Sequence, residues 1–492
     1  MANVSLTNAD AWPSAYRPTG TVVTALSRFP PLDFFRVVRN AVLIVALLLL
    51  NKAGTSGAVL FFGIMAIMAL KSPQAAFQAL ALIGLGLMMN TFYVPKTLPW
   101  TIGRLALPLL IMVRFAIDAS RLRASPFARP HYVAFLLYVF TMAVCSIASG
   151  WFTQIALLKL FFFWAYVTAV MVGVAVLRER KIDLTEWFVS LISAATAVGI
   201  AAMVMGQSRN MMRLGRRLEL FNGALGHSNS HSLYGSMFVL FLATIVVMGT
   251  YRRRWIAAPL IVAWLSFMAL SASRSSVLAT VIGSATLFLM TSQRVRRLGS
   301  RLQVNLPRGT QVFFVLAALL GVFAYNAVSG GRVWKAVVEF VNKQEVDETE
   351  EVAEIESGDI VGSRKALIEL SWRNFLENPV CGIGFGVATT EHFAKNATLF
   401  TASTEKGVLA TAVLEEGGVL GATAFLCFVA AFYLDMYRQK NLSSIIAMTT
   451  FLGSNFGEAS FVAAGGMGGF GWVMVGAAMI LGDHCWQTQS PP

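Results

Sequence analysis

Long apolar runs, separated by short polar loops, recur along this chain and limit what it can fold into. A helix needs about 20 mostly apolar residues to cross the hydrocarbon core of a bilayer. In lipid the backbone must also satisfy its own hydrogen bonds, which a helix does. The runs therefore predict an all-α polytopic transmembrane helical bundle of roughly 12 to 14 spans. The candidate spans are residues 37–53, 56–71, 74–92, 99–118, 131–149, 153–177, 185–206, 231–249, 255–271, 274–291, 311–329, 412–434, 442–459 and 464–482.

The composition indicates the same class. Hydrophobic residues make up 56% and charged residues 13% of the chain, whereas soluble domains carry about 25% charged residues. The net charge of +14 could indicate nucleic acid, but cytoplasmic loops of membrane proteins need the same basic excess, so we expect no nucleic-acid partner. The four cysteines lack a C-x-x-C pair and predict neither a disulfide framework nor a zinc site. Cys145 and Cys427 lie in apolar runs and are expected to be small core residues.

The positions of Lys and Arg predict the orientation, because cytoplasmic loops are enriched in them. With the amino terminus inside, successive basic clusters fall on the cytoplasmic side, and fourteen spans leave both termini cytoplasmic. The expected organisation is a cytoplasmic segment 1–36, a transmembrane bundle 37–329 with an outer loop 207–230, a large periplasmic loop 330–405, carboxy-terminal helices 406–483 and a cytoplasmic tail 484–492.

Arginines in three outward stretches run against this trend. They are Arg209, Arg213, Arg216 and Arg217 in the first loop, Arg274 in a short turn, and Arg332, Arg364 and Arg373 in the large loop. The guanidinium fork suits phosphate, so this pattern predicts a polyanionic substrate such as a lipid pyrophosphate. The alternative is that they are solvated loop arginines without a function. Eight carboxylates in residues 345–359 favour a solvated face over a divalent-ion site, because the glycine spacing of a calcium loop is absent.

The second part of the large loop predicts an amphipathic helix that starts after Ser363, with Ser363 as its N-cap and Arg364 at its first position. Apolar residues recur at near-helical spacing. They are Ala366, Leu367, Leu370, Phe375 and Leu376. Asn378-Pro379 ends the helix, and three alternate glycines follow in a turn. A guanidinium beside free N–H groups at a helix start is a candidate anion site.

Four stretches together resemble the O-antigen ligase and polymerase family. "SRKALIELSWRNFLENPVCGIGFG" is similar to the family's arginine-led helix ending in N-P-x-x-G-x-G, and "LSASRSSVLATVIG" at 270–283 is similar to its S-R-S segment. "GALGHSNSHSLYGSMFVL" at 223–240 follows Arg216-Arg217-Leu218 and looks like its arginine-then-G-x-x-x-x-N stretch. "LEEGGVLGATAFL" at 414–426 matches its E-x-G-x-x-G start of a span. The resemblance covers roughly residues 207–435.

The resemblance implies a metal-independent, inverting glycosyltransferase without a cofactor in the bacterial inner membrane. Such an enzyme moves a glycan from undecaprenyl pyrophosphate to an acceptor glycan or glycolipid on the periplasmic side, beside chain-length regulator and flippase proteins. By position, Arg364 would hold the pyrophosphate with Arg217 as its partner. Further substrate contacts would come from Arg213, Arg216 and Arg274, and Glu416 would organise the start of the span.

One departure concerns the acceptor. The family's ligases carry a His-Asn pair about nine residues before this glutamate, where this chain has Gly407 and Val408. Glu405 is the substitute that we predict as the base. His227 and His231, at i and i+4, could share a helix face as substrate contacts, or they are structural.

The missing pair favours a polymerase of exopolysaccharide, capsule or O-antigen units over a ligase to lipid A core. The alternative from another class is a lipid-linked oligosaccharide flippase, although such a transporter is expected to show internal repeats. A membrane anchor or sensor would leave the outer arginines unexplained. Lys159 lies just inside a predicted span. It either snorkels to the interface or binds the carrier's phosphates.

Overall fold

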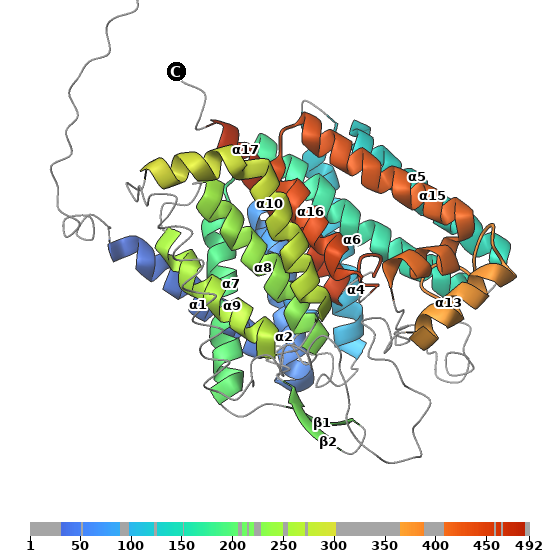
Figure 1. The fold of residues 1–492 in the computed structure, drawn as a ribbon, viewed down its shortest axis with the longest axis horizontal. Coiled ribbons are helices and arrows are strands. Elements are labelled where there is room, and N and C mark those ends of the chain that lie inside the picture. Colours follow the sequence, from blue (N-terminus) through green and yellow to red (C-terminus); the bar gives the residue numbers. More distant parts are fainter. Residues whose placement is uncertain are drawn as a thin grey trace, which may run out of the picture.

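The computed structural model of the chain describes residues 31–50, 53–88, 98–122, 125–150, 152–204, 209–213, 216–220, 228–248, 254–270, 274–301, 365–387, 408–456, 459–463 and 466–487. Over these ranges the protein is a helical bundle (Figure 1). Its α-helices are α1 (Pro31–Leu50), α2 (Gly54–Lys71), α3 (Pro73–Met88), α4 (Leu98–Ala119), α5 (Pro130–Ser149), α6 (Thr153–Glu179), α7 (Thr185–Val204), α8 (Ser228–Met248), α9 (Arg254–Leu270), α10 (Arg274–Arg301), α13 (Lys365–Glu377), α15 (Leu409–Arg438), α16 (Leu442–Ser454) and α17 (Gly466–Gln487).

Helices form at the positions of the spans predicted from the apolar runs. Each predicted span coincides with a helix within several residues, except 311–329, which lies outside the described residues. The largest difference is at α10, which continues to Arg301 and so includes part of a basic stretch predicted to be a loop. The amphipathic helix predicted after Ser363 is also confirmed, as α13.

A short β-hairpin, which the sequence did not predict, forms within the stretch 207–230. Strand β1 (Arg209–Arg213) pairs antiparallel with β2 (Arg216–Leu220), with Arg213 opposite Arg216. Two residues, Leu214 and Gly215, connect the strands in the sequence, which is the commonest connection length in a hairpin. Strands this short carry too few alternating residues for a sequence pattern to reveal them.

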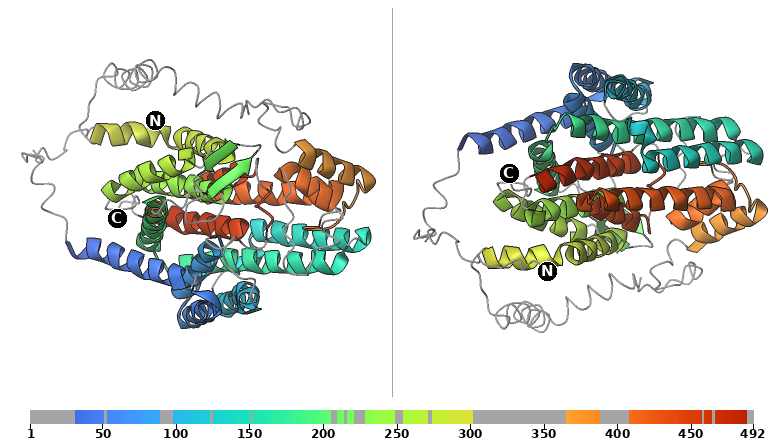
Figure 2. Two further views of the ribbon diagram at one scale, coloured as in Figure 1. Left: turned by 90° about the horizontal axis from the view of Figure 1, so that it is seen from below. Right: turned by 90° about the horizontal axis from the view of Figure 1, so that it is seen from above.

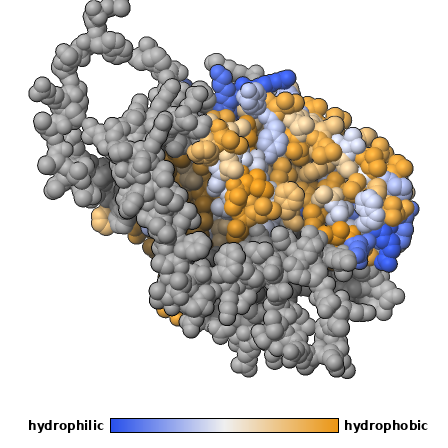
Figure 3. Space-filling model, in the orientation of Figure 1, coloured by the Kyte–Doolittle hydropathy of each residue, from blue (hydrophilic) through white to orange (hydrophobic). Residues whose placement is uncertain are grey.

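Apolar side chains on the outside of the bundle show where lipid covers it. Helices α2, α5, α6 and α15 are long and apolar enough to cross a membrane, and shorter apolar helices accompany them. Along α5, exposed apolar residues recur at helical spacing, as at Val133, Leu137, Phe140, Val144 and Ile147. Figure 3 shows a hydrophobic band bordered by hydrophilic surface at the top and at the lower right, around α13. The protein is a multi-pass membrane protein.

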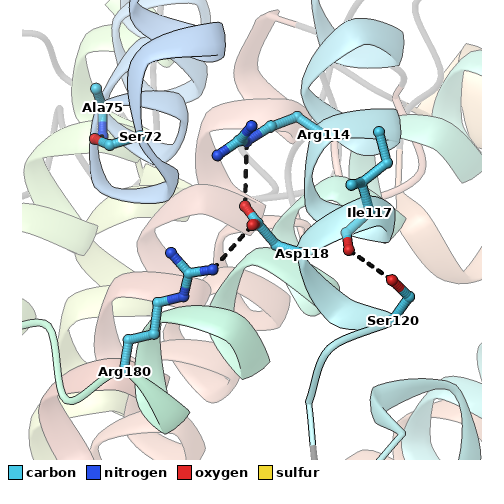
Figure 4. Close-up of polar contacts among 7 residues, drawn as sticks. All are labelled: Ser72, Ala75, Arg114, Ile117, Asp118, Ser120 and Arg180. Atoms are coloured by element: carbon cyan, nitrogen blue, oxygen red, sulfur yellow. Dashed lines mark hydrogen bonds and ion pairs between the residues drawn. The ribbon is translucent and has the colours of Figure 1, made fainter.

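Helix α6 lies at the centre of the bundle and connects its two ends. Most of its residues are buried against α4, α5 and α17. Figure 4 shows the polar contacts just beyond its carboxyl end, where Arg180 Nη2 donates to Asp118 Oδ1 at 2.9 Å. The other carboxylate oxygen of the buried Asp118 forms an ion pair with Arg114 Nε at 3.1 Å. This end is the one that the basic loops predict to face the cytoplasm.

Candidate functional site

The candidate site is built on helix α13 and the turn that follows it at the opposite end of α6. Residues 378–387, here named the glycine turn, contain Gly382, Gly384 and Gly386 at φ of 65°, 109° and 64°. Only glycine adopts such φ values at low cost. Helix α13 and the glycine turn pack together against α15 at the lower right of the bundle (Figure 1).

Helix α15 is broken where the glycine turn meets it. Gly418 has φ 58° and ψ −157°, which is outside the helical region, although the helix continues on both sides. In an unbroken helix the N–H groups of Val419 and Leu420 would bond to the carbonyls of Glu415 and Glu416. The break leaves these four backbone groups without their helical partners.

The glycine turn supplies a partner to each of these groups. The Ile383 N–H donates to Glu415 O at 2.8 Å and the Gly384 N–H donates to Glu416 O at 3.0 Å. In return, the N–H groups of the two residues after the break donate to the carbonyls of Pro379 and Val380, at 2.9 and 3.2 Å. We name this set of four hydrogen bonds the backbone joint.

The backbone joint brings two main chains so close that glycine is required on both. A Cβ on Gly418 would lie 2.6 Å from the Cys381 nitrogen, and a Cβ on Gly382 would lie 2.6 Å from the Glu416 carbonyl carbon. Real Cβ atoms do not approach backbone this closely. The N-P-x-x-G-x-G and E-x-G-x-x-G stretches are therefore the two halves of one contact.

Glu415 also binds α13 through its side chain. Its Oε2 accepts a hydrogen bond from Ser371 Oγ at 2.8 Å, and its Oε1 accepts one from Asn374 Nδ2 at 2.7 Å. All three side chains are buried. A buried carboxylate needs such donors to offset its desolvation. This contact, the Glu415 clamp, fixes how α13 lies on α15.

The inner face of α13 is not the one that its apolar residues suggest. Leu376, one of the apolar positions at near-helical spacing, is 59% exposed, and Trp372 is 48% exposed. The innermost positions are instead the polar Ser371 and Asn374. The physical reason is that the surface opposite them is a carboxylate, so hydrogen bonding and not apolar burial selects the inner face.

An aromatic side chain and two serines anchor the glycine turn in the bundle. Phe385 is 2% exposed, and its ring centroid lies 5.5 Å from that of Phe163 on α6. Its backbone N–H donates to Ser146 Oγ of α5 at 3.1 Å, while Ser149 Oγ donates to Ile383 O at 3.2 Å. These contacts leave the turn little freedom to move relative to the transmembrane helices.

Lys159 adds a contact from α6. Its Nζ donates to Gly386 O at 2.6 Å, and its side chain occupies the space that a Cβ on Gly386 would need. The sequence offered snorkelling or phosphate binding for this lysine; the structure shows it bound to the glycine turn. Its charge therefore lies at the end of the bundle that carries α13.

The structure describes the predicted site residues to different extents. Glu416 is buried in α15 beside the break, and its carbonyl belongs to the backbone joint. Only the backbone is described for the following residues: Arg213, Arg216 and Arg217 in the hairpin, His231 in α8, and Arg274 at the start of α10. Arg364, Glu405 and His227 lie outside the described residues. The roles predicted for all of these residues stay predictions.

The hairpin and α13 lie toward the lower side of the bundle in Figure 1, and both are in view when the bundle is seen from below (Figure 2, left). Helix α13 begins at Lys365, so the chain position of Arg364 directly precedes its first turn. The unpaired N–H groups of a helix start carry partial positive charge and favour an anion. Within the described ranges, no group of three or more His, Cys, Asp or Glu residues could hold a metal ion.

The sequence analysis missed three residues of the site. Glu415, Ser371 and Asn374 form the clamp, whereas the sequence pointed to Glu416 and to the apolar positions of α13. Two signals were present: a second acidic residue in an apolar run, and a polar pair at i and i+3 on one helix. Polar residues at that spacing share a helix face.

One comparison with known proteins bears on the site. Residues 259–426, about a third of the chain, match the family model described as O-antigen ligase. The matched segment includes α13, the glycine turn and the break in α15. The family resemblance is thereby confirmed for the motifs at 270–283, 363–386 and 414–426, whereas the stretch at 223–240 lies outside the match. No curated protein matches the chain.

Replacing Gly418 by alanine tests the backbone joint. The added Cβ meets the backbone of Val380 and Cys381 at a φ of 58°. Such strain costs about 1–3 kcal/mol before any clash. We expect a clearly lower melting temperature in detergent. Gly63→Ala is the control, because a Cβ there meets nothing within 4 Å. Equal melting temperatures for the two variants would contradict the joint.

The Glu415 clamp is tested by comparing alanine with glutamine. Glu415→Ala removes the acceptor of two buried donors, at about 1–3 kcal/mol for each hydrogen bond lost. Glutamine keeps one acceptor for Asn374 and offers an N–H to the Ser371 hydroxyl, so it should largely rescue the protein. We expect trypsin to cleave after the exposed Arg373 much faster in the alanine variant. Glu377→Ala, at the exposed end of α13, is the control; cleavage as slow as in the control would disprove the clamp.

Proposed function

Because residues 259–426 match the O-antigen ligase family, we propose that the protein is a membrane glycosyltransferase of surface polysaccharide synthesis. It transfers a glycan from a polyprenyl-pyrophosphate donor to the hydroxyl of an acceptor sugar, and polymerisation is favoured over ligation to lipid A core. The observation that carries the proposal is the docking of α13 by the backbone joint and the clamp. A helix start held this firmly can present fixed positive charge to a leaving pyrophosphate.

The donor site is proposed at the start of α13. Arg364 holds the pyrophosphate, Arg217 assists it from the hairpin, and Arg213, Arg216 and Arg274 add positive charge. The register of the hairpin supports this grouping, since it pairs Arg213 with Arg216 on adjacent strands. Guanidinium groups hold phosphate oxygens in a forked geometry and stabilise the charge that develops as the sugar–oxygen bond breaks.

The acceptor side of the reaction is assigned to Glu405. Its carboxylate takes the proton of the acceptor hydroxyl as the hydroxyl oxygen bonds to the anomeric carbon and the pyrophosphate departs on the opposite face. This in-line displacement inverts the configuration at the sugar carbon. His227 and His231 are proposed as contacts to the donor or acceptor glycan. No step in this scheme requires the protein to supply a cofactor.

The site is proposed to face the periplasm, with both termini in the cytoplasm of a bacterial inner-membrane protein. Two features support this placement. The basic loops fall on the inner side in this orientation, and α6 separates the ion pairs of Asp118 from the glycine turn along its length. The undecaprenyl-linked donor arrives from a flippase, and a chain-length regulator is the expected partner during elongation.

Arg364→Ala should abolish elongation of the glycan. Purified protein in vesicles with labelled polyprenyl-pyrophosphate glycan is expected to lengthen the glycan unaided, and the variant should be slower by about 10²–10³-fold because a donor to the leaving charge is lost. The product length is read on a gel. Arg373→Ala, exposed on the same helix, is the matched control and should keep the wild-type rate.

Two results would overturn the proposed function. Lengthening by Arg364→Ala at the rate of the Arg373→Ala control would remove the donor site. Transfer of labelled donor across the vesicle membrane, without any change in glycan length, would instead identify the flippase. Equal melting temperatures of both variants show that they are equally well folded, so that the comparison concerns chemistry.

Glu405→Gln tests the base. Glutamine keeps the shape but cannot take a proton, so the rate of elongation should fall by about 10²–10⁴-fold. The acidic limb of the pH–rate profile, which reports ionisation of the base, should disappear in the variant. An unchanged rate over the whole pH range would remove this residue from the mechanism.

A further inference from the structure

Two cysteines that are far apart in the sequence lie on either side of the break in α15. Cys145 is buried in α5, and its Sγ donates to Gly417 O at 3.6 Å. Cys381 belongs to the glycine turn, where its backbone nitrogen lies against Gly418. The two thiols lie close enough to interact with each other, and both are free in this structure. The fold thus brings the two cysteines together at the backbone joint, one beside Gly417 and the other beside Gly418.

We propose that Cys145 and Cys381 form a disulfide bond that ties the glycine turn covalently to α5. The proposal rests on the periplasmic placement of the site in the proposed function. The periplasm is oxidising, so neighbouring thiols that reach it become paired. The sequence predicted no disulfide framework, because the spacing of the cysteines shows no pairing; only the folded chain brings these two together.

The reaction is an exchange with the disulfide of a periplasmic dithiol oxidant. The thiolate of Cys381, which is partly exposed, attacks one sulfur of that disulfide and releases the other as a thiolate. The thiolate of Cys145 then attacks the Cys381 sulfur and releases the oxidant as a dithiol. Two thiols of the protein lose two protons and two electrons, and the oxidant takes up both.

The remaining cysteines serve as internal controls. Cys427 was expected in the core but is exposed on α15, on a helix that carries exposed apolar side chains. Its neighbours on that surface are lipid-facing, so it has no reason to pair with the site. The side chain of Cys485 is outside the described set.

Counting thiols in the full-length protein tests the proposal. Membranes are trapped with acid, the protein is denatured without reductant, and free thiols are labelled with a maleimide polymer that shifts the band on a gel. We expect two labelled thiols without reductant and four with it. Cys381→Ser and Cys145→Ser should each show three thiols in both conditions. The control Cys427→Ser should show one without reductant and three with it.

Four labelled thiols in the unreduced wild-type protein would overturn the proposal, as would loss of the bond in Cys427→Ser. Oxidation with copper phenanthroline then identifies the premise that failed. If copper forms the bond, the thiols are close enough and the premise of an oxidising periplasm is wrong. If copper forms no bond, the premise that the thiols are neighbours is wrong. Because thiol counting reads the redox state of the cysteines and not glycan transfer, its outcome is independent of the Arg364 test.

Discussion

The structure around α13 depends on the four backbone groups that the break at Gly418 sets free. An N–H or carbonyl that is buried without a partner costs free energy comparable to a lost hydrogen bond, because no water reaches it. The break in α15 is therefore sustainable only while the glycine turn occupies it, and the turn needs the break for the same reason. Each element completes the other, so they form together or not at all.

Glu415 makes this dependence matter for the site. Its carbonyl accepts a hydrogen bond from the Ile383 N–H in the backbone joint. Its carboxylate accepts hydrogen bonds from Ser371 and Asn374 of α13 in the clamp. One residue thus fixes both the turn and the helix before it. Residues on a loop ordinarily hold reacting groups less precisely than residues on helices. Contacts from rigid transmembrane helices can hold those groups within a narrow range of positions. The docking transfers the rigidity of the bundle to the start of α13.

The sequence predicts the span helices well because a helix that crosses the hydrocarbon core needs a long apolar run, which is visible in the sequence. It does not predict the break, because "LEEGGVLGATAFL" reads as one continuous helix in which glycine costs only about 1 kcal/mol. The break forms because the glycine turn, a distant segment of the chain, binds the freed backbone groups. A local sequence pattern carries no information about such a partner. The apolar pattern does not predict the inner face of α13 for a related reason. Ser371 and Asn374 are inner residues only because a carboxylate lies opposite them. Local preference yields to tertiary pairing at the positions that build the site.

The position of the break along α15 also bears on the kind of donor that the site can serve. Residues 419–438 form a helix of about 30 Å at 1.5 Å per residue, which is the thickness of the hydrocarbon core. If this helix crosses the core once, Gly418 is at the boundary between lipid and water, and the side chain of Val419, the next residue, is exposed. Trp372, half exposed on α13, is typical of such an interface. A pyrophosphate attached to a polyprenyl chain is confined to this boundary, so a site built here suits a lipid-linked donor better than a soluble sugar nucleotide.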